Sequence, residues 1–369
     1  MRVASSVSIL GAGPAGFALA ADLKNHGTDT LLYSHRTHLS HAKAVMKTGR
    51  LQLSCKMEGF TNLRLTTDMA EAVAFSKILI LTVPSTGQLT LLKELKHLDL
   101  RSHTIIAIPG NLFSLLKEVD IEAENILETN LSPYSCRMED DTLVVFGRKR
   151  VVHIAAQRTA AVRPGFREEI ESVFPTTTLR WCDSVVEVCL ANVNGVFHPL
   201  MMLMNAGRIE DASSDFLLYR DGLSRSVANA MLAVDRVRMD IAAKLGLRAA
   251  TAVDISNECY GQAFTDLVDL ARNSPPHNKL RAPASFENRN ISEDVADLLV
   301  SWHGLAEVVG VDASPIAAVI VLAEMATGLD LRQTGRGLDK LRLNGLGPGQ
   351  LVDMFGPCMT PPPEAEARL

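Results

Sequence analysis

The sequence predicts a doubly wound α/β sheet domain followed by an all-helical domain, and two contrasting patterns along the chain support this fold class. In the first half, short β-branched runs alternate with helical patterns, and the largely apolar runs at residues 77–83 and 104–108 are each followed by a proline. Such runs are typical of parallel strands that helices cover on both faces. Beyond about residue 185 the pattern becomes helical. Strand–helix alternation followed by helices alone therefore indicates two domains.

The elements of the sheet domain can be placed in chain order. Residues 7–10 are expected to form a buried strand, residues 15–25 a helix of small residues, and residues 30–33 a second strand. The two apolar runs supply further parallel strands. Residues 143–146 and 151–155 flank a short basic segment, and we expect them to pair as a hairpin at the far edge of the sheet.

Three helices are expected in the second domain. Ser224 can cap a long amphipathic helix that Gly246 ends, and another helical stretch begins near Ser292. Pro315 can open a third helix, because proline is tolerated in the first helical turn.

Length and composition agree with this division. The chain has 369 residues, of which 47% are hydrophobic and 21% charged, and its formal net charge is −5. These fractions are those of an ordinary globular protein and argue against a disordered or fibrous one. The net negative charge does not favour nucleic acid or an anionic membrane as a partner. We expect a sheet domain at residues 1–185, a helical domain at 186–360 and a flexible tail at 361–369.

Cysteine usage and hydropathy bear on cofactors and location. None of the six cysteines forms a C-x-x-C pair or clusters with histidines at zinc-ligand spacing. We therefore expect no metal and reduced thiols in a cytoplasmic protein. The apolar run at residues 315–323 is too short to span a bilayer, so no membrane segment is expected.

A glycine-rich loop lies directly after the first expected strand. Gly11, Gly13 and Gly16 have the G-x-G-x-x-G spacing, with Pro14 and Ala15 opening the helix. The first glycine permits a tight turn, the second lets a pyrophosphate approach the backbone, and the third lets helix pack on strand. In this strand–turn–helix setting the motif predicts a dinucleotide-binding, Rossmann-type domain.

The residues after the second strand bear on which dinucleotide binds. An acidic residue usually binds the ribose hydroxyls of NAD at this point, but residues 33–37 contain none. Ser34 and Arg36 can instead hold a 2′-phosphate, so NADP(H) is favoured over NAD(H). Val83 and Pro84 end a later strand and are expected to line the nicotinamide half of the site.

One histidine stands apart from the other nine. His198 follows two amides, Asn192 and Asn194, and precedes a highly apolar stretch of leucines and methionines. A histidine at the edge of an apolar helix is suited to proton transfer near neutral pH. From the residues alone, a catalytic role and a structural one are equally open.

Several short motifs, taken together in their order, resemble the octopine/nopaline (opine) dehydrogenase family over most of the chain. They are the glycine-rich loop, residues 128–137, the segment ending at His198 and Pro199, residues 219–223, residues 288–295, Gly310 and Val311 with Ser314 and Pro315, and residues 335–339. The resemblance implies a Rossmann domain with a helical domain of the 6-phosphogluconate-dehydrogenase type. It also implies that the amine of an amino acid condenses with a 2-oxo acid and that NAD(P)H reduces the resulting imine.

The resemblance also implies roles for individual residues. His198 matches the catalytic histidine of the family, and Asp294 matches the acid that pairs with it. Tyr134 and Arg137 lie in a segment near the 2-oxo acid, where an arginine can bind a carboxylate bidentately. Asn194 can bind substrate or the nicotinamide amide, or can cap its helix.

Two other functions stay open at this point. A related two-domain reductase of 2-oxo or 3-hydroxy acids, such as a ketopantoate-type enzyme, would rely on a lysine in the helical domain, but Lys244 and Lys279 do not lie beside His198 in the sequence. A non-catalytic NADP-binding sensor would bind the cofactor without turnover. The family commonly has a proline soon after its Glu-Asp pair, where this chain reads Val295-Ala296. Small-molecule substrates and a homodimer are the expected partners.

Overall fold

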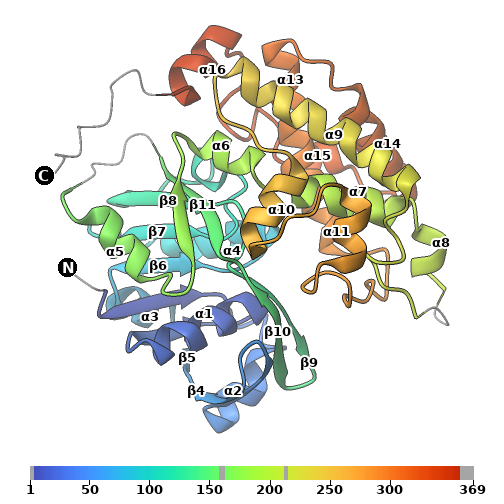
Figure 1. Cartoon of the computed structure of the whole chain (residues 1–369). Coiled ribbons are helices and arrows are strands. Elements are labelled where there is room, and N and C mark those ends of the chain that lie inside the picture. The colour runs from blue at the N-terminus through green and yellow to red at the C-terminus, as the bar shows by residue number, and fades with distance from the viewer. Residues whose placement is uncertain (1–3, 158–162, 212–214, 358–369) are drawn as a thin grey trace, which may run out of the picture.

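The computed structural model describes residues 4–157, 163–211 and 215–357. Its sheet domain is built on an eight-stranded sheet in the order β12-β11-β8-β7-β6-β1-β2-β5, in which every pair is parallel except β8 with β11 (Figure 1). The strands are β1 (Ser6–Leu10), β2 (Asp29–Tyr33), β5 (Arg64–Thr66), β6 (Ile78–Leu81), β7 (Thr104–Ala107), β8 (Asn125–Thr129), β11 (Val151–Ala156) and β12 (Thr178–Trp181). The predicted Rossmann-type fold is confirmed.

Helices cover both faces of this sheet. One face packs against α1 (Pro14–Asn25) and α5 (Phe166–Ser172) in a core that includes Phe17 and Phe166. The other face packs against α3 (Met69–Phe75) and α4 (Ser85–Leu95), and its core continues without a break into the helical domain. Because the two domains share this apolar core, the carboxyl ends of β6 and β7 lie next to the helical domain.

A second, four-stranded sheet lies beside the first in the order β4-β3-β10-β9. Its strands are β3 (Arg50–Cys55), β4 (Gly59–Asn62), β9 (Tyr134–Glu139) and β10 (Thr142–Arg148), and α2 (Ala42–Thr48) precedes them. The expected hairpin of residues 143–146 with 151–155 is therefore wrong. Strand β10 pairs with β9 and β3, whereas β11 pairs with β8 and β12. The chain passes from one sheet to the other because Lys149 and Arg150 donate their backbone N–H groups to Pro133 and Cys259 instead of closing a turn.

The helical domain contains the three expected helices. Ser224 caps α9 (Arg225–Lys244) by accepting the N–H of Val227, Gly246 follows in a left-handed conformation, and Pro315 lies in the first turn of α14 (Ser314–Thr327). The other helices are α6 (Val185–Leu190), α7 (Asn194–Leu203), α8 (Ala206–Ile209), α10 (Ala252–Tyr260), α11 (Leu267–Asn273), α12 (Arg289–Ser292), the π-helix η2 (Asp294–Leu299), α13 (Val300–Val309), α15 (Leu331–Thr334) and α16 (Pro348–Phe355), and a short 3₁₀ turn, η1 (Phe113–Leu115), lies in the sheet domain. The expected tail lies outside the described residues.

Among the described residues, one helical run, Val185–Leu203, is long and apolar enough to cross a membrane, but 83% of its apolar window is buried in the fold. This burial is that of core helices, and α7 packs directly against α9 and α14. The five cysteines of the described part, Cys55, Cys136, Cys182, Cys189 and Cys259, are free thiols.

Candidate active site

The glycine-rich loop between β1 and α1 has the backbone shape that a pyrophosphate requires. Gly11 has φ of 138°, a conformation that only glycine adopts readily. A Cβ at Gly16 would collide with the carbonyl oxygen of Gly11, whereas the space around Gly13 is open. Thr82, at the end of β6, holds the loop by donating its hydroxyl to the same Gly11 carbonyl over 2.9 Å.

The first turn of α1 is open to an anion. Gly13 is the N-cap, no side chain caps this end, and the first turn, which Pro14 and Ala15 begin, has no acidic residue. Free N–H groups and the helix dipole favour a phosphate there. Val83 lies against the loop, 3.0 Å from where a Cβ of its first glycine would lie, and Pro84 is the N-cap of α4. These residues therefore fit a dinucleotide.

The two residues expected to select the dinucleotide lie in different environments. Arg36 is exposed and lines a pocket of about 360 Å³ at the end of β2. Ser34 is buried, and its hydroxyl donates to the carbonyl of His38 over 3.1 Å. The same pocket also holds two carboxylates, Asp68 and Glu94. Sequence reasoning missed Glu94 because it lies on α4, far from the strand end in the chain.

His198 and Asp294 lie together although 96 residues separate them in the chain. The Nδ1 of His198 on α7 is 2.7 Å from an Oδ2 of Asp294 at the start of η2, and the side chains are only 12% and 6% exposed. The Nε2 of His198 is 3.0 Å from the hydroxyl of Tyr219, which the sequence did not single out as a site residue. Burial raises the pKa of Tyr219, so its hydroxyl is protonated at neutral pH.

Two further aromatic rings, those of His277 and Tyr260, lie next to the contact between His198 and Tyr219. The ring of Tyr219 lies 4.8 Å from that of His277, and the ring of Tyr260 lies 5.2 Å from His277 on another side. Burial, with smaller electrostatic effects of Lys149 and His198, lowers the pKa of His277 to about 3. His277 is therefore neutral, and the hydroxyl of Ser274 lies 2.8 Å from its Nδ1.

The lowered pKa of His277 predicts a loss of stability in acid. In the unfolded chain this histidine binds a proton below about pH 6.5, but the folded protein holds it neutral down to about pH 3. The free energy of unfolding should therefore fall as the pH drops from 6.5 towards 3, by up to about 1.4 kcal/mol per pH unit from this group. Urea unfolding at pH 7 and pH 5 should show a smaller loss for His277→Gln than for the wild type. An equal loss in both would contradict this prediction. His303→Gln is the control, since this half-buried histidine lies on α13 and pairs with the exposed Glu307.

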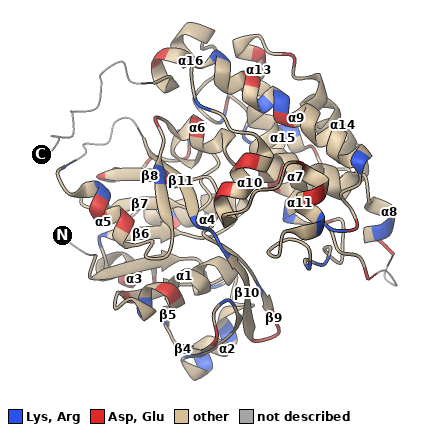
Figure 2. Ribbon diagram, in the orientation of Figure 1, with Lys and Arg blue, Asp and Glu red and all other residues tan. Residues whose placement is uncertain are grey.

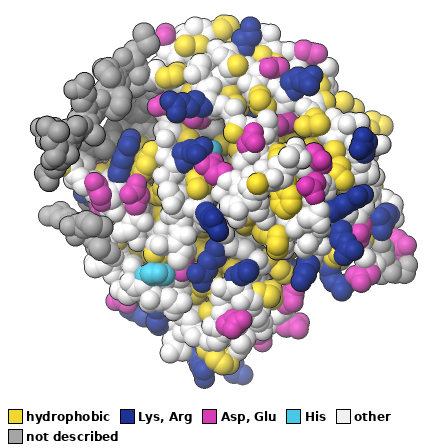
Figure 3. All heavy atoms as spheres, in the orientation of Figure 1, with side chains coloured by type: hydrophobic (Ala, Val, Ile, Leu, Met, Phe, Trp, Pro, Cys, Tyr) yellow, Lys and Arg dark blue, Asp and Glu magenta, His cyan; other side chains and the backbone are white. Residues whose placement is uncertain are grey.

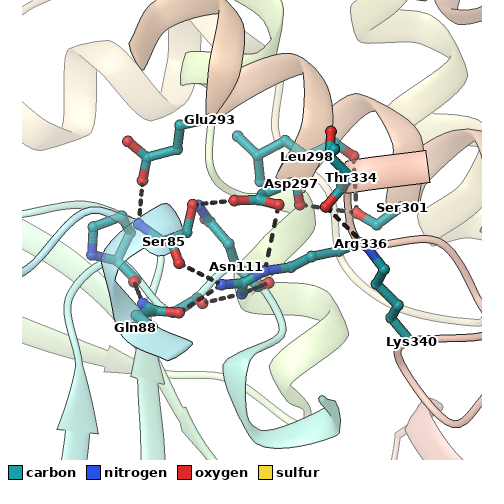
Figure 4. Close-up of polar contacts among 12 residues, drawn as sticks. Ser85, Gln88, Asn111, Glu293, Asp297, Leu298, Ser301, Thr334, Arg336 and Lys340 are labelled. Atoms are coloured by element: carbon teal, nitrogen blue, oxygen red, sulfur yellow. Dashed lines mark hydrogen bonds and ion pairs between the residues drawn. The ribbon is translucent and has the colours of Figure 1, made fainter. Parts of the chain in front are cut away.

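A buried polar network joins the two domains next to Asp294 (Figure 4). Glu293 accepts the backbone N–H of Ser85 over 2.9 Å, and Asp297 accepts the Ser85 hydroxyl over 2.5 Å. The guanidinium of Arg336, 4% exposed, lies 3.6 Å from Asp297. Its Nη2 donates to Gln88 over 2.6 Å and to the Ser85 carbonyl over 3.2 Å. Its Nη1 donates to the carbonyls of the two residues that follow Pro109, so the turns after β6 and β7 are tied to η2.

The remaining predicted site residues divide into two groups. Asn194 begins α7 one helical turn before His198 and so shares its face, while Asn192 donates to Asn111 at the end of β7 over 2.8 Å. By contrast, Arg137 on β9 pairs with Glu139 over 2.6 Å, and the Tyr134 hydroxyl donates to Asp22 on α1 over 2.7 Å. Both therefore have structural partners, and within the described part of the chain neither forms a hydrogen bond or ion pair with His198.

A glycine loop on a parallel sheet, joined to a helical domain that holds a His–Asp pair at the boundary, defines a two-domain NAD(P)-dependent oxidoreductase. Comparison with known families agrees. The model of the NAD/NADP octopine/nopaline dehydrogenase alpha-helical domain matches residues 181–327, and that of the NAD-dependent glycerol-3-phosphate dehydrogenase N-terminus matches residues 6–131. Residues 181–327 thus form a helical domain of the octopine/nopaline dehydrogenase type.

Relatives and solved structures extend over nearly the whole chain. Vitopine synthase of Allorhizobium ampelinum is 28% identical and covers 95% of this chain and 98% of its own. Opine dehydrogenase of Arthrobacter sp. is also 28% identical, with 94% and 97% covered. Octopine dehydrogenase in complex with NADH and agmatine superposes with a TM-score of 0.74 at 17% identity, covering 96% and 98%. Yersinopine dehydrogenase with NADP⁺ bound gives 0.68 at 14%, covering 96% and 99%. The two structures confirm the fold.

Proposed function

We propose that this protein catalyses the reversible, NAD(P)H-dependent condensation of an amino acid with a 2-oxo acid, with His198 as its acid–base group. The observation that carries the proposal is the 2.7 Å contact of His198 with Asp294 beside the turns that follow β6 and β7. In balance, the amine, the 2-oxo acid, NAD(P)H and one proton give the secondary amine, NAD(P)⁺ and one water. The dinucleotide supplies the hydride that reduces the imine.

The carboxylate of Asp294 decides which nitrogen of His198 faces the substrate. An ionised Asp294 accepts the N–H of Nδ1, so the proton that His198 gains and gives is at Nε2. That nitrogen faces the hydroxyl of Tyr219, which accepts from the imidazolium or donates to the neutral ring. His198 can thus protonate the oxygen that leaves as water when the imine forms, and Asp294 stabilises the cation meanwhile.

Turnover with defined substrates tests this reaction. NADPH and NADH oxidation would be followed against a matrix of amino acids and 2-oxo acids, with the product mass measured. We expect oxidation only when both an amine and a 2-oxo acid are present, with a product mass equal to their condensed and reduced adduct. Reduction of a 2-oxo acid without amine would instead indicate a ketopantoate-type reductase. Cofactor binding without turnover across the whole matrix would indicate a sensor.

We also propose that NADP(H) is preferred, with Arg36 as the residue that holds the 2′-phosphate. Its pocket also contains two carboxylates, each directed at other partners, and the Nε2 of His35 lies 3.0 Å from Glu94. Asp68 caps α3, and Glu94 accepts the Tyr33 hydroxyl over 2.8 Å. Among the described residues, the guanidinium of Arg36 makes one weak hydrogen bond, to the Thr67 carbonyl at 3.4 Å, so its other donors are available to a phosphate.

Arg36→Ala should therefore weaken NADPH binding more than NADH binding. A charge-assisted contact of about 1.5–3 kcal/mol corresponds to a loss of roughly 10- to 100-fold in NADPH affinity, with NADH affinity within about 2-fold of the wild type. Fluorescence titration of both cofactors measures this. Arg50→Ala, an exposed arginine over Phe60 away from the pocket, is the control. Equal effects of Arg36→Ala on both cofactors would remove this residue from the selection.

A further inference from the structure

A second polar pocket lies in the helical domain, away from the glycine loop. It encloses about 690 Å³ between the segments around α8 and α11. Blue basic residues mark both of these segments in Figure 2, and dark blue side chains gather on this part of the surface in Figure 3. Six residues line it: Arg208, Arg220, Asp221, Arg272, Asn273 and Asn278.

The pocket carries an excess of positive charge in a protein whose net charge is −5. Its three guanidinium groups face a single carboxylate, Asp221, which accepts the backbone N–H of Leu217 over 3.0 Å. Within the described ranges, none of the three arginines has a carboxylate at ion-pair distance. Arg281 nearby behaves differently, since it pairs with Asp215 over 2.7 Å.

The three exposed arginines come from separate segments of the helical domain, so the charge of the pocket does not rest on a single element. The guanidinium of Arg208 lies over the ring of Phe216, 4.2 Å from its centre. Arg272 belongs to the last turn of α11, and its carbonyl accepts the side-chain amide of Asn278 over 3.3 Å. Arg220 follows the buried Tyr219. Several guanidinium groups that line one pocket can bind carboxylate or phosphate oxygens bidentately.

We propose that this pocket binds a small multivalent anion, either a phosphate or a di- or tricarboxylate. A single carboxylate would satisfy one guanidinium group, whereas the three that line this pocket can be satisfied together only by several anionic oxygens. Two of the lining residues, Arg220 and Asn278, directly follow Tyr219 and His277 in the chain, whose rings lie 4.8 Å apart in the His198 site. Binding there does not depend on the reaction proposed above.

Calorimetric titration of the full chain with inorganic phosphate, citrate and acetate tests this site. We expect phosphate or citrate to bind and acetate not to, and the tighter of the first two identifies the kind of ligand. The double variant Arg220→Gln with Arg272→Gln should bind the anion about tenfold more weakly. Arg281→Gln, a matched exposed arginine outside the pocket, should bind as the wild type does.

The glycine loop can also bind phosphate, so the titrations are run with saturating NADPH, and only the difference between wild type and double variant is assigned to the pocket. This difference in anion affinity is expected even if the protein turns over no substrate, so the test does not depend on the proposed reaction. The proposal is overturned if the wild type and the double variant bind alike, if acetate binds as well as citrate, or if Arg281→Gln weakens binding equally. Raising the salt concentration should weaken the binding in the wild type.

Discussion

His198→Ala is expected to lower the rate of NAD(P)H oxidation, with an amino acid and a 2-oxo acid present, by about 10²–10⁴-fold. The alanine cannot supply or accept the proton at Nε2, and the carboxylate of Asp294 loses its partner at 2.7 Å. Cofactor affinity should stay within about 2-fold of the wild type, because the glycine loop lies in the other domain. The loss should therefore appear in kcat, measured by steady-state kinetics under saturating cofactor.

Asp294→Asn separates the charge of the pair from its shape. The asparagine keeps the volume but removes the negative charge that stabilises imidazolium, and its amide can donate to Nδ1 and favour the other tautomer. We expect a loss comparable to that of His198→Ala and a shift of the pH–rate profile. His303→Ala is the control, since this histidine on α13 lies 3.5 Å from Glu307 at the surface. If His198→Ala oxidised NAD(P)H at the wild-type rate, His198 would have no role in the mechanism.

The order of strands and helices could be predicted because local patterns determine it. The continuous apolar runs became β6 and β7, and the capping residue Ser224 begins α9 as expected. The hairpin prediction failed because two apolar runs near in sequence need not pair. Here β10 continues a second sheet that begins with β3, about 90 residues earlier, and no local signal records that partner.

The candidate site could be predicted only in part for the same reason. Sequence context and family resemblance pointed to His198 and Asp294, whereas the spacing of 96 residues alone says nothing about contact. Tyr219 lies in a turn and His277 in a proline-rich loop, so neither has a periodic pattern that could have marked it. Arg137 pairs with Glu139, which lies two residues away on the same face of the strand, so the i, i+2 spacing in the sequence already contains this partner.

The polar network around Arg336 could not be predicted at all from spacing. Its partners on the sheet domain, Ser85, Gln88 and the turn after β7, lie 225 to 251 residues earlier in the chain. The network matters for the site because Asp297 lies in the same π-helix as Asp294. Arg336 thus links the π-helix that begins at Asp294 to the turns where the cofactor is expected.

Arg336→Met is expected to destabilise the protein by about 3–5 kcal/mol, the cost of removing one partner from a buried ion pair. Methionine has a similar length but no donors. Asp297 would keep its buried charge without the guanidinium, and the acceptors on Gln88, Ser85 and the turn after β7 would lose their N–H partners. Arg332→Met, at an exposed pair with Glu324, should cost less than about 1 kcal/mol and serves as the control. Urea unfolding measures both.

The pH dependence of Arg336→Met distinguishes a lost ion pair from lost packing. Burial raises the pKa of Asp297, and Arg336 is the main group that opposes this rise. Without the guanidinium the pKa should rise further, so the folded variant binds a proton that the unfolded chain releases above about pH 4. Its stability relative to the wild type should therefore fall as the pH increases, and the difference should be larger at pH 8 than at pH 5.

The double variant with Asp297→Leu should recover part of the stability at pH 8, because it removes the uncompensated charge. A deficit that is the same at both pH values, with no recovery in the double variant, would mean that Arg336 acts by packing alone.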